Sequence, residues 1–330
     1  MDLVNAVPAG ANETHNGAPL TIGLDIGGTN LRAGVVTAEG RIIDQMALDT
    51  PSTPVEAEDA VVTLVDALRK KHEISAVGMA VAGFLDPECE TVRFAPHLPW
   101  REAPLRRIME DKLGLPVRLE HDANSAAWGE YRFGAGRGAD TWVFFAVGTG
   151  IGATLFINGA IYRGAFGTAP EFGHLSVVPG TEGRLCSCGK CGCLERYASG
   201  TALVDTAIEL SGTVGTSALA KAIADPSTAV TGHDVVLAAR GGDALGVATL
   251  DEFGRWLGVG LSFVADVLDP ELIVLGGGVS RDADLFLDRA SDVMASSVVG
   301  AGHRPLPRIS TAELGAEAGM IGVADLARRS

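Results

Sequence analysis

The sequence predicts an α/β fold with two domains, and three observations support this prediction. Short apolar runs that end in glycine turns alternate with stretches whose apolar residues recur at helical spacing, which is the pattern of strands and helices in an α/β protein. The order strand, glycine turn, strand, hairpin turn begins at residue 21 and recurs from residue 141, which indicates a duplicated architecture. The length of 330 residues exceeds the roughly 100–200 residues of one domain, so we expect two.

The first half of the chain is expected to begin with strands. Residues 21–28 form a β-branched apolar run closed by paired glycines, which is typical of a buried strand that enters a tight turn. A second strand lies within residues 31–40, and Glu39-Gly40 is the expected hairpin turn before a third strand. Two further elements are a helix at 61–71 and a buried strand at 76–83.

The recurrence of this pattern covers residues 141–162. It contains an apolar strand, a glycine turn at 148–152, a second strand, and Asn158-Gly159 as the hairpin turn. Ala-rich spacing after Asp122 indicates a helix that opens at the end of a strand. A long buried helix at 244–268 leads into a strand with a further glycine turn, after which a helix is expected beyond Ser280.

Charge and hydropathy exclude several classes of protein. The 26 Lys and Arg residues stand against 41 Asp and Glu residues, and the formal charge of −15 would repel nucleic acid and anionic membranes. No apolar run reaches the roughly 18–20 residues of a membrane span. Residues 1–20 lack the basic start and apolar core of a signal peptide. We therefore expect a flexible tail at 1–20 on a cytoplasmic protein with no nucleic-acid or membrane partner.

Three glycine turns follow predicted strands and are candidates for binding phosphate. Backbone N–H groups of glycine turns can approach an anion closely, and threonine hydroxyls add donors. The candidates are Asp25, Gly27, Gly28 and Thr29 in the first turn, Gly148, Thr149, Gly150 and Gly152 in the second, and Gly276, Gly277 and Gly278 in the third. Asp25, at a strand end, is placed to hold Mg²⁺ through water. Each turn alone also fits an ordinary hairpin or strand-to-helix turn.

Four of the five cysteines fall within eight residues and indicate a metal site. Disulfides among such near neighbours would constrain almost no chain. Three thiolates and one imidazole complete a closed tetrahedral zinc site, and the candidate ligands are Cys186, Cys188, Cys193 and His174. Cys191 is a surplus thiol that could replace Cys188 or Cys193. The alternatives are a reduced, metal-free loop and a zinc ribbon that binds nucleic acid.

Three carboxylates accompany these motifs. Asp122 lies at the start of a predicted helix, where a carboxylate could simply cap the free N–H groups. Glu171 lies three residues before His174, and Glu195 lies two residues after Cys193. A metal that fixes His174 and Cys193 would also fix both glutamates in a polar pocket. For each glutamate alone, a solvated surface charge is the alternative.

Taken together, these motifs resemble the ROK family (repressors, open reading frames, kinases) from about Thr21 to the C-terminus. The resemblance rests on DIGGTN at 25–30, AVAGFLD at 80–86, FAP at 94–96, HDANSAAWGEYRFGAG at 121–136, GTGIG at 148–152, EFGH at 171–174, CxCGxxGCxE at 186–195, YASG at 197–200 and LGGGVS at 275–280. The cysteine signature with EFGH is highly specific, whereas each glycine turn is not.

The resemblance implies a sugar-kinase/actin-like ATPase (ribonuclease H-like) fold, with two lobes around a central cleft for ATP and sugar. The smaller lobe would cover 21–122, with a C-terminal helix at 316–330 returning to it. The larger lobe would cover 123–315 and include the cysteine loop. The resemblance also implies a homo-oligomer, either a dimer or a tetramer.

The resemblance further implies roles for single residues. Asp122 would be the catalytic base and would contact the sugar, as would His121, Glu171, His174 and Glu195. His174, Cys186, Cys188 and Cys193 would bind structural Zn²⁺, and the glycine turns would bind ATP with Mg²⁺.

The implied activity is ATP-dependent phosphorylation of a hexose, glucose at its 6-hydroxyl first of all. The family pattern has Asn where this sequence has His97 and His121. Mannose, allose or an N-acetylhexosamine therefore remain alternative substrates, and ADP or polyphosphate remain alternative donors. The alternative from another class is a sugar-responsive transcription regulator, for which residues 1–20 are too few to build a DNA-binding helix-turn-helix.

Overall fold

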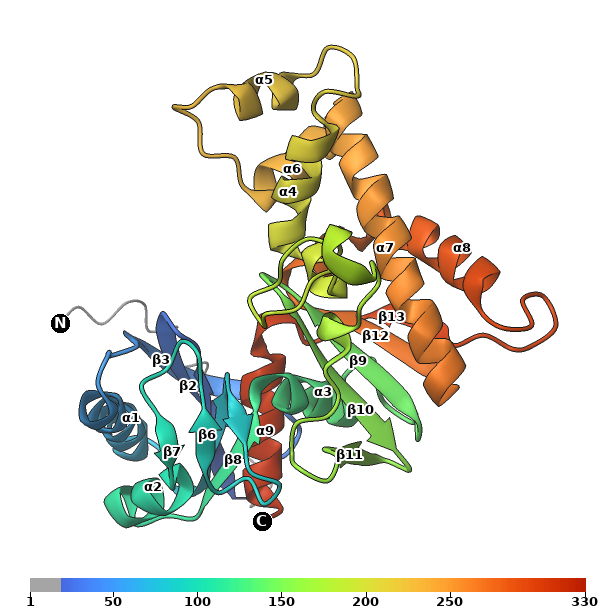
Figure 1. Cartoon of the computed structure of the whole chain (residues 1–330). Coiled ribbons are helices and arrows are strands. Elements are labelled where there is room, and N and C mark those ends of the chain that lie inside the picture. Colours follow the sequence, from blue (N-terminus) through green and yellow to red (C-terminus); the bar gives the residue numbers. More distant parts are fainter. Residues whose placement is uncertain (1–18) are drawn as a thin grey trace. The chain divides into compact units, whose positions relative to one another are not determined.

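The structure, a computed structural model, describes residues 19–330 (Figure 1). These residues form two compact units. Unit 1 holds the described residues up to Ala139, together with Thr154–Pro170 and Glu313–Ser330; unit 2 holds Asp140–Ala153 and Glu171–Ala312. Sheets and helices occur in both units, so the predicted α/β class is confirmed. The predicted tail at 1–20 lies outside the described residues except for its last two, and Leu20 already belongs to a strand.

Unit 1 is built on a five-stranded sheet of order β3-β2-β1-β4-β8. Its strands are β1 (Leu20–Ile26), β2 (Asn30–Val36), β3 (Ile42–Asp49), β4 (Ile74–Val81) and β8 (Val117–His121). The first three strands pair antiparallel, whereas β4 pairs parallel with both β1 and β8. Because β1 and β8 run in the same direction, the glycine turn after β1 and Asp122 after β8 lie at the same edge of the sheet.

Helix α1 (Pro54–Arg69) and the sheet share one apolar core. Val61, Leu64 and Leu68 are buried in it with strand residues such as Leu24, and each such side chain contributes about 1.5–3 kcal/mol by leaving water. The helix begins where the Thr53 hydroxyl accepts the Glu56 N–H at 3.4 Å, which satisfies one of its free donors.

Helix α9 (Ala318–Arg328) lies directly on the backbone of β1 and β4, beside α3 (Asp122–Phe133) (Figure 1). A Cβ atom at Gly23 would overlap the carbonyl oxygen of Met320, and one at Gly78 would overlap that of Val323. Glycine at these strand positions therefore permits the close approach of the helix.

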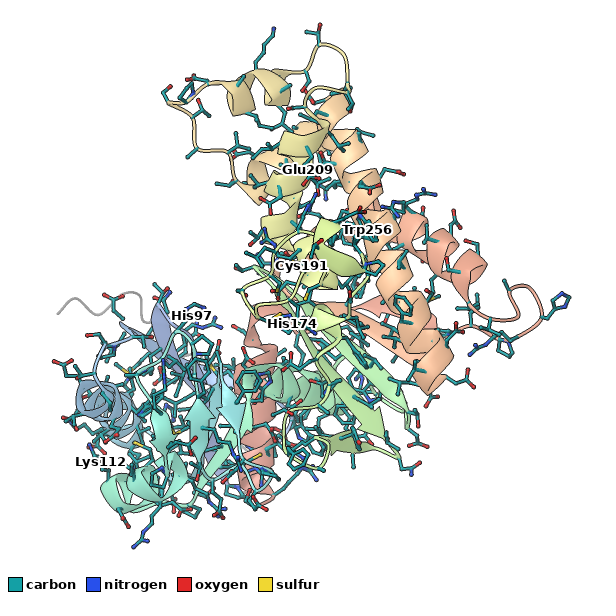
Figure 2. The ribbon with its side chains drawn as sticks, viewed as in Figure 1. His97, Lys112, His174, Cys191, Glu209 and Trp256 are labelled. Atoms are coloured by element: carbon teal, nitrogen blue, oxygen red, sulfur yellow. The ribbon has the colours of Figure 1, made fainter. Side chains whose placement is uncertain are left out.

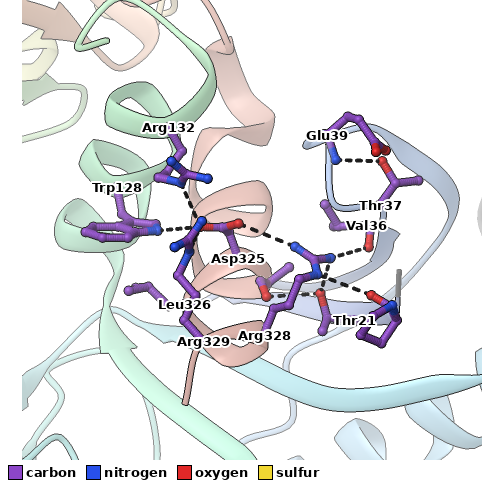
Figure 3. Close-up of polar contacts among 12 residues, drawn as sticks. Thr21, Val36, Thr37, Glu39, Trp128, Arg132, Asp325, Leu326, Arg328 and Arg329 are labelled. Atoms are coloured by element: carbon purple, nitrogen blue, oxygen red, sulfur yellow. Dashed lines mark hydrogen bonds and ion pairs between the residues drawn. The ribbon is translucent and has the colours of Figure 1, made fainter. Parts of the chain in front are cut away.

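A buried carboxylate ties α9 to α3 (Figure 3). Asp325 is 1% exposed and accepts bonds from Trp128 Nε1 at 2.9 Å and Arg132 Nε at 3.2 Å. Burial opposes its charge, but the hydrogen bonds from Trp128 and Arg329 hold the pKa of Asp325 below its ordinary value. Next to it, Arg328 donates to the carbonyl oxygen of Val36 in β2 at 2.8 Å.

A second five-stranded sheet has the order β11-β10-β9-β12-β13. Its strands are β9 (Trp142–Val147), β10 (Ile151–Ile157), β11 (Ala160–Tyr162), β12 (Leu272–Gly276) and β13 (Arg308–Thr311), and the division between the units falls within β10. β12 pairs parallel with β9 and with β13. The glycine turns after β9 and β12 therefore open at one edge of this sheet.

The remaining elements complete the two units. Unit 1 also holds α2 (Leu105–Leu113) and a small sheet of β5 (Phe84–Leu85), β6 (Val92–Phe94) and β7 (Arg101–Ala103). In unit 2, α7 (Ala244–Leu268) contacts α4 (Gly200–Leu210), α6 (Gly232–Arg240) and α8 (Leu287–Ser297), and a short α5 (Ala218–Ala224) contacts α6. Within residues 19–330, no helix has both the length and the apolar character needed to cross a membrane.

The predicted strands, hairpin turns and long helix are confirmed, and the bounds of α7 are those predicted. Two predictions are wrong in detail. The helix predicted at 61–71 runs from Pro54 to Arg69. The turn after β12 leads into a 3-10 helix, η4 (Gly278–Leu285), and the α-helix begins only at Leu287. The small sheet, α4 to α6 and β13 were not predicted.

The predicted lobe boundary at residue 122 stays a prediction. In the structure α3 and residues 154–170 group with unit 1, because α3 packs against α9 along its length.

We expect Asp325→Asn to lower the free energy of unfolding by about 1.5–3 kcal/mol at pH 7, because the buried carboxylate loses its charge-assisted hydrogen bonds with Trp128 and the surrounding arginines. A carboxylate whose pKa is lowered by folding stabilises the protein above its unfolded pKa, and this stabilisation is lost as the pH falls. The difference between wild type and variant should therefore shrink below about pH 4. Urea denaturation measures it, with the exposed Asp111→Asn as control; an unchanged difference at pH 3 would contradict the ion-pair explanation.

Candidate active site and metal centre

Four side chains of unit 2 form a group that could hold a metal ion. The ligand atoms of His174, Cys186, Cys188 and Cys193 all lie within 4.8 Å of one another. Cys186 Sγ is 3.6 Å from His174 Nδ1, and Cys188 Sγ is 3.6 Å from Cys193 Sγ. Tetrahedral zinc with ordinary bond lengths requires about 3.6 Å for the first kind of pair and about 3.8 Å for the second. The four residues therefore fit zinc in ligand type, and these two pairs fit it in spacing.

The protonation of the thiols at this position is coupled to metal binding. Burial of Cys193, with the Cys188 and Cys186 thiols beside it, raises the pKa of the Cys193 thiol to about 12. A thiolate is the form that binds metal, and a bound cation makes its formation favourable. Cys191 is not a member of the group; its backbone pairs with Leu185 across the loop. The positions of His174 and Cys191 are labelled in Figure 2.

Both predicted glutamates lie beside this group. Glu171 Oε2 is 3.9 Å from His174 Nε2, the ring nitrogen that does not face Cys186. Glu195 Oε1 is 4.0 Å from Cys186 Sγ, and Glu195 Oε2 accepts the N–H of Ile151 at 2.8 Å. Glu195 therefore joins the cysteine loop to the glycine turn after β9.

Gly150 is required by this arrangement. A Cβ atom at position 150 would overlap the carboxylate of Glu195. The glycine is thus explained by the carboxylate that lies against it, and not by a free turn in solvent.

A cavity of about 670 Å³ opens where the second and third glycine turns meet. Gly277 brings the turns together, because its Cα faces the carbonyl oxygen of Val147 so closely that a Cβ would overlap it. The cavity is lined by Gly148, Thr149, Gly200, Thr201, Leu203, Val204, Gly232, His233, Val236, Gly278, Val279 and Asp282.

The cavity contains part of the predicted set and several residues that were not predicted. Gly148, Thr149 and Gly278 line it, whereas Gly150, Gly152, Gly276 and Gly277 are not among its lining residues. The additional walls are the N-terminal turns of α4 and α6. Their N-caps, Ser199 and Thr231, each accept a backbone N–H of the first turn. A Ser or Thr before Gly was a helix-start signal in the sequence, but nothing there showed that the two starts meet.

The first glycine turn belongs to unit 1. Asp25 forms an ion pair with Arg32 in the neighbouring strand β2. Thr50 fixes the turn on its other side, since its hydroxyl donates to the Gly27 carbonyl at 2.7 Å and its N–H to the Thr29 carbonyl at 2.9 Å. Gly28 is exposed and lies against the Cβ atom and the carbonyl oxygen of His97. His97 is labelled in Figure 2.

Asp122 is the first residue of α3, and His121 is its N-cap. Asp122 Oδ1 accepts the N–H of Ala123 at 2.7 Å and lies 3.2 Å from His121 Nε2. Among the described residues, no hydrogen bond or ion pair engages Oδ2. The carboxylate is 45% exposed, so one of its oxygens is available to a ligand. Asp122 therefore does not occupy the N-cap position, one of the two interpretations that the sequence allowed.

The chain is similar to known glucokinases over most of its length. The ROK family model matches residues 21–330. A glucokinase of Streptomyces coelicolor is 43% identical over 311 residues, covering 94% of this chain and 98% of that protein. A crystal structure of a ROK family glucokinase from Streptomyces griseus, in complex with glucose and AMPPNP, is 42% identical with a TM-score of 0.81, covering 94% of this chain and all of that one.

A ROK hexokinase from Thermus thermophilus is 29% identical with a TM-score of 0.75, covering 93% of this chain and 97% of that one. The fold predicted from the motifs, that of the sugar-kinase/actin-like ATPases, is confirmed by these structures. With a family model that spans nearly the whole described chain, this protein belongs to the ROK family.

Proposed function

We propose that this protein is a glucokinase, which transfers the γ-phosphoryl group of ATP to the 6-hydroxyl of glucose. The observation that carries the proposal is the similarity, over 94% of the chain, to a Streptomyces griseus glucokinase that binds glucose and AMPPNP. The Streptomyces coelicolor relative with the same named activity supports it.

Asp122 is proposed as the catalytic base. Its Oδ1 is held by the Ala123 N–H, whereas Oδ2 is available to accept the proton of the sugar hydroxyl as that oxygen attacks the γ-phosphorus. Asp122 is held at a strand-to-helix junction, which supports this role because a base must be positioned within hydrogen-bond reach of the proton it removes.

The cavity of unit 2 is proposed to bind ATP. Its walls combine two glycine turns with the N-terminal turns of α4 and α6, and free N–H groups at such positions favour phosphate. We propose that Gly27, Gly28 and Thr29 contact phosphate as well. Mg²⁺, held through water by Asp25, would neutralise charge on the phosphate oxygens.

His121, Glu171, His174 and Glu195 are proposed to bind sugar hydroxyls, and the metal is proposed to be a structural Zn²⁺. With Nδ1 of His174 directed at the metal group, Nε2 is available to a hydroxyl. Zinc would thus hold the imidazole and, through the loop, the carboxylate of Glu195. We also propose a homo-oligomer, which size-exclusion chromatography with light scattering can test.

We expect purified protein to phosphorylate glucose with ATP, and Asp122→Asn to lower kcat by about 10²–10⁴-fold with little change in glucose affinity, because the variant loses its general base. A coupled assay for glucose 6-phosphate measures kcat, and calorimetry measures binding. Asp111→Asn, an exposed substitution in α2, is the matched control. Turnover close to that of wild type in Asp122→Asn would remove this residue from the base role.

We expect one zinc per chain, measured by elemental analysis. Cys186→Ser should lower zinc content and melting temperature together and raise the KM for glucose by about tenfold or more, because His174 and Glu195 lose their support. Cys191→Ser is the matched control from the same loop and should keep its zinc. Active wild-type enzyme without metal would refute the structural site, and zinc loss in the control would refute the ligand set.

The identity of the hexose is tested at His97 and His121, which stand where the family pattern has Asn. An imidazole is bulkier than the amide and offers one donor and one acceptor when neutral. We expect His97→Asn and His121→Asn, singly and together, to change the ratio of kcat/KM for glucose over mannose, allose and N-acetylglucosamine by about tenfold, or about 1.4 kcal/mol. His303→Asn, an exposed imidazole, is the control. Unchanged ratios would show that neither position sets specificity.

A further inference from the structure

A fully buried carboxylate lies two residues before Asp122. Glu120 is the next-to-last residue of β8 and pairs with Ala80 of β4. It is 0% exposed. A charged group is rarely buried unless other groups compensate it. The groups around Glu120 are therefore informative.

One oxygen of Glu120 binds both sides of the strand-to-helix junction. Oε1 accepts the backbone N–H of His121 at 3.1 Å and the side-chain amide of Asn124 at 3.0 Å. Asp122 stands between these two residues. A single acceptor atom thus holds the backbone before Asp122 and the Asn124 side chain after it, which restricts the orientation of Asp122 at the junction.

The other oxygen of Glu120 faces two arginines. Arg163 donates to Oε2 in a short ion pair, and Arg118 lies 3.5 Å from the same atom. Burial alone would favour the protonated acid, but the charge and hydrogen bond of Arg163 hold the pKa of Glu120 below its ordinary value. The buried thiol of Cys89, 3.9 Å from Oε1, completes the surroundings.

Arg163 also belongs to a defined loop. Its carbonyl oxygen accepts the N–H of Ala169 at 3.0 Å, which closes residues 163–169. Gly167 of this loop packs against the backbone of Leu85 and Asp86. The chain then continues into Glu171 and His174. The ion pair therefore fixes the β8–α3 junction to the loop that leads into the proposed sugar-binding residues.

We propose that Glu120 is a positioning residue for Asp122, and that its ion pair with Arg163 holds the β8–α3 junction in the geometry that phosphoryl transfer requires. This inference rests on the proposed function, since it assumes that Asp122 acts as the base. Glu120 is placed outside the reacting atoms, and its effect on the reaction passes through the His121 backbone and the Asn124 side chain, on either side of Asp122.

The test is a double-mutant cycle on the full-length enzyme. Glu120→Gln keeps the shape of the side chain but removes its charge. We expect it to lower kcat by about tenfold or more and to change the KM for glucose by less than about threefold, because a small misplacement of the base slows the chemical step. In the Asp122→Asn background the same substitution should have no further effect on the residual turnover.

The matched control is Glu130→Gln. Glu130 is also 0% exposed, but it lies within α3 and accepts the N–H groups of Ala135 and Leu314 near the C-terminal end of that helix. We expect it to lower the melting temperature with kcat unchanged. If Glu120→Gln does not fold, the Glu120→Gln/Arg163→Met double variant removes both charges and takes its place in the cycle.

Hydrogen–deuterium exchange gives a readout that does not depend on activity. Exchange in a peptide covering residues 117–133 should accelerate at the junction in Glu120→Gln and not in Glu130→Gln. The inference is overturned if Glu120→Gln keeps kcat within about twofold of wild type, or if exchange at the junction is unchanged. It is also overturned if Glu120→Gln slows the Asp122→Asn enzyme by the same factor by which it slows the wild-type enzyme. Wild type that does not phosphorylate glucose, with the exchange result as expected, would instead refute the proposed function.

Discussion

Parallel pairing of strands is the constraint on which both candidate sites depend. In unit 1, β4 joins β1 and β8 in the same direction, and in unit 2, β12 joins β9. Parallel strands end at the same sheet edge, so the turns that follow them are brought together whatever their separation along the chain. The glycine turn after β1 thus shares an edge with Asp122, and the turns after β9 and β12 line one cavity.

Buried and half-buried carboxylates then fix the segments around these edges. Glu120, Glu130 and Glu195 each accept at least one backbone N–H, and each joins segments that are distant in sequence. A carboxylate can serve several donors at once, and hydrogen bonds to a charged acceptor are stronger than neutral ones. In unit 1, Arg118 and Arg163 compensate the free-energy cost of burying the charge of Glu120. Hydrogen bonds to these carboxylates therefore hold the loops in fixed positions, as a catalytic or binding site requires.

The sequence predicted the candidate site well where several residues of one kind lie close together along the chain. Four clustered cysteines and His174 predicted a zinc site but left open which three thiols would bind, and the structure brings Cys186, Cys188 and Cys193 together with His174. The two helix starts at Gly200 and Gly232 were not predicted as walls of the cavity. Each is a common local pattern, and their meeting depends on the packing of α4 against α6.

By itself the sequence determined the α/β class, the two glycine-turn repeats, the long helix and the ligand types of the metal group, because these follow from periodicity, turn chemistry and residue identity over short spans. Only the tertiary structure decided that Asp122 follows its N-cap, that Gly150 lies against Glu195, and that Arg163 compensates Glu120. The second and third of these are contacts between segments up to 45 residues apart, the distance from Gly150 to Glu195. Such contacts depend on which distant residues compensate a buried charge or pack closely against a backbone. A local sequence pattern does not contain that information.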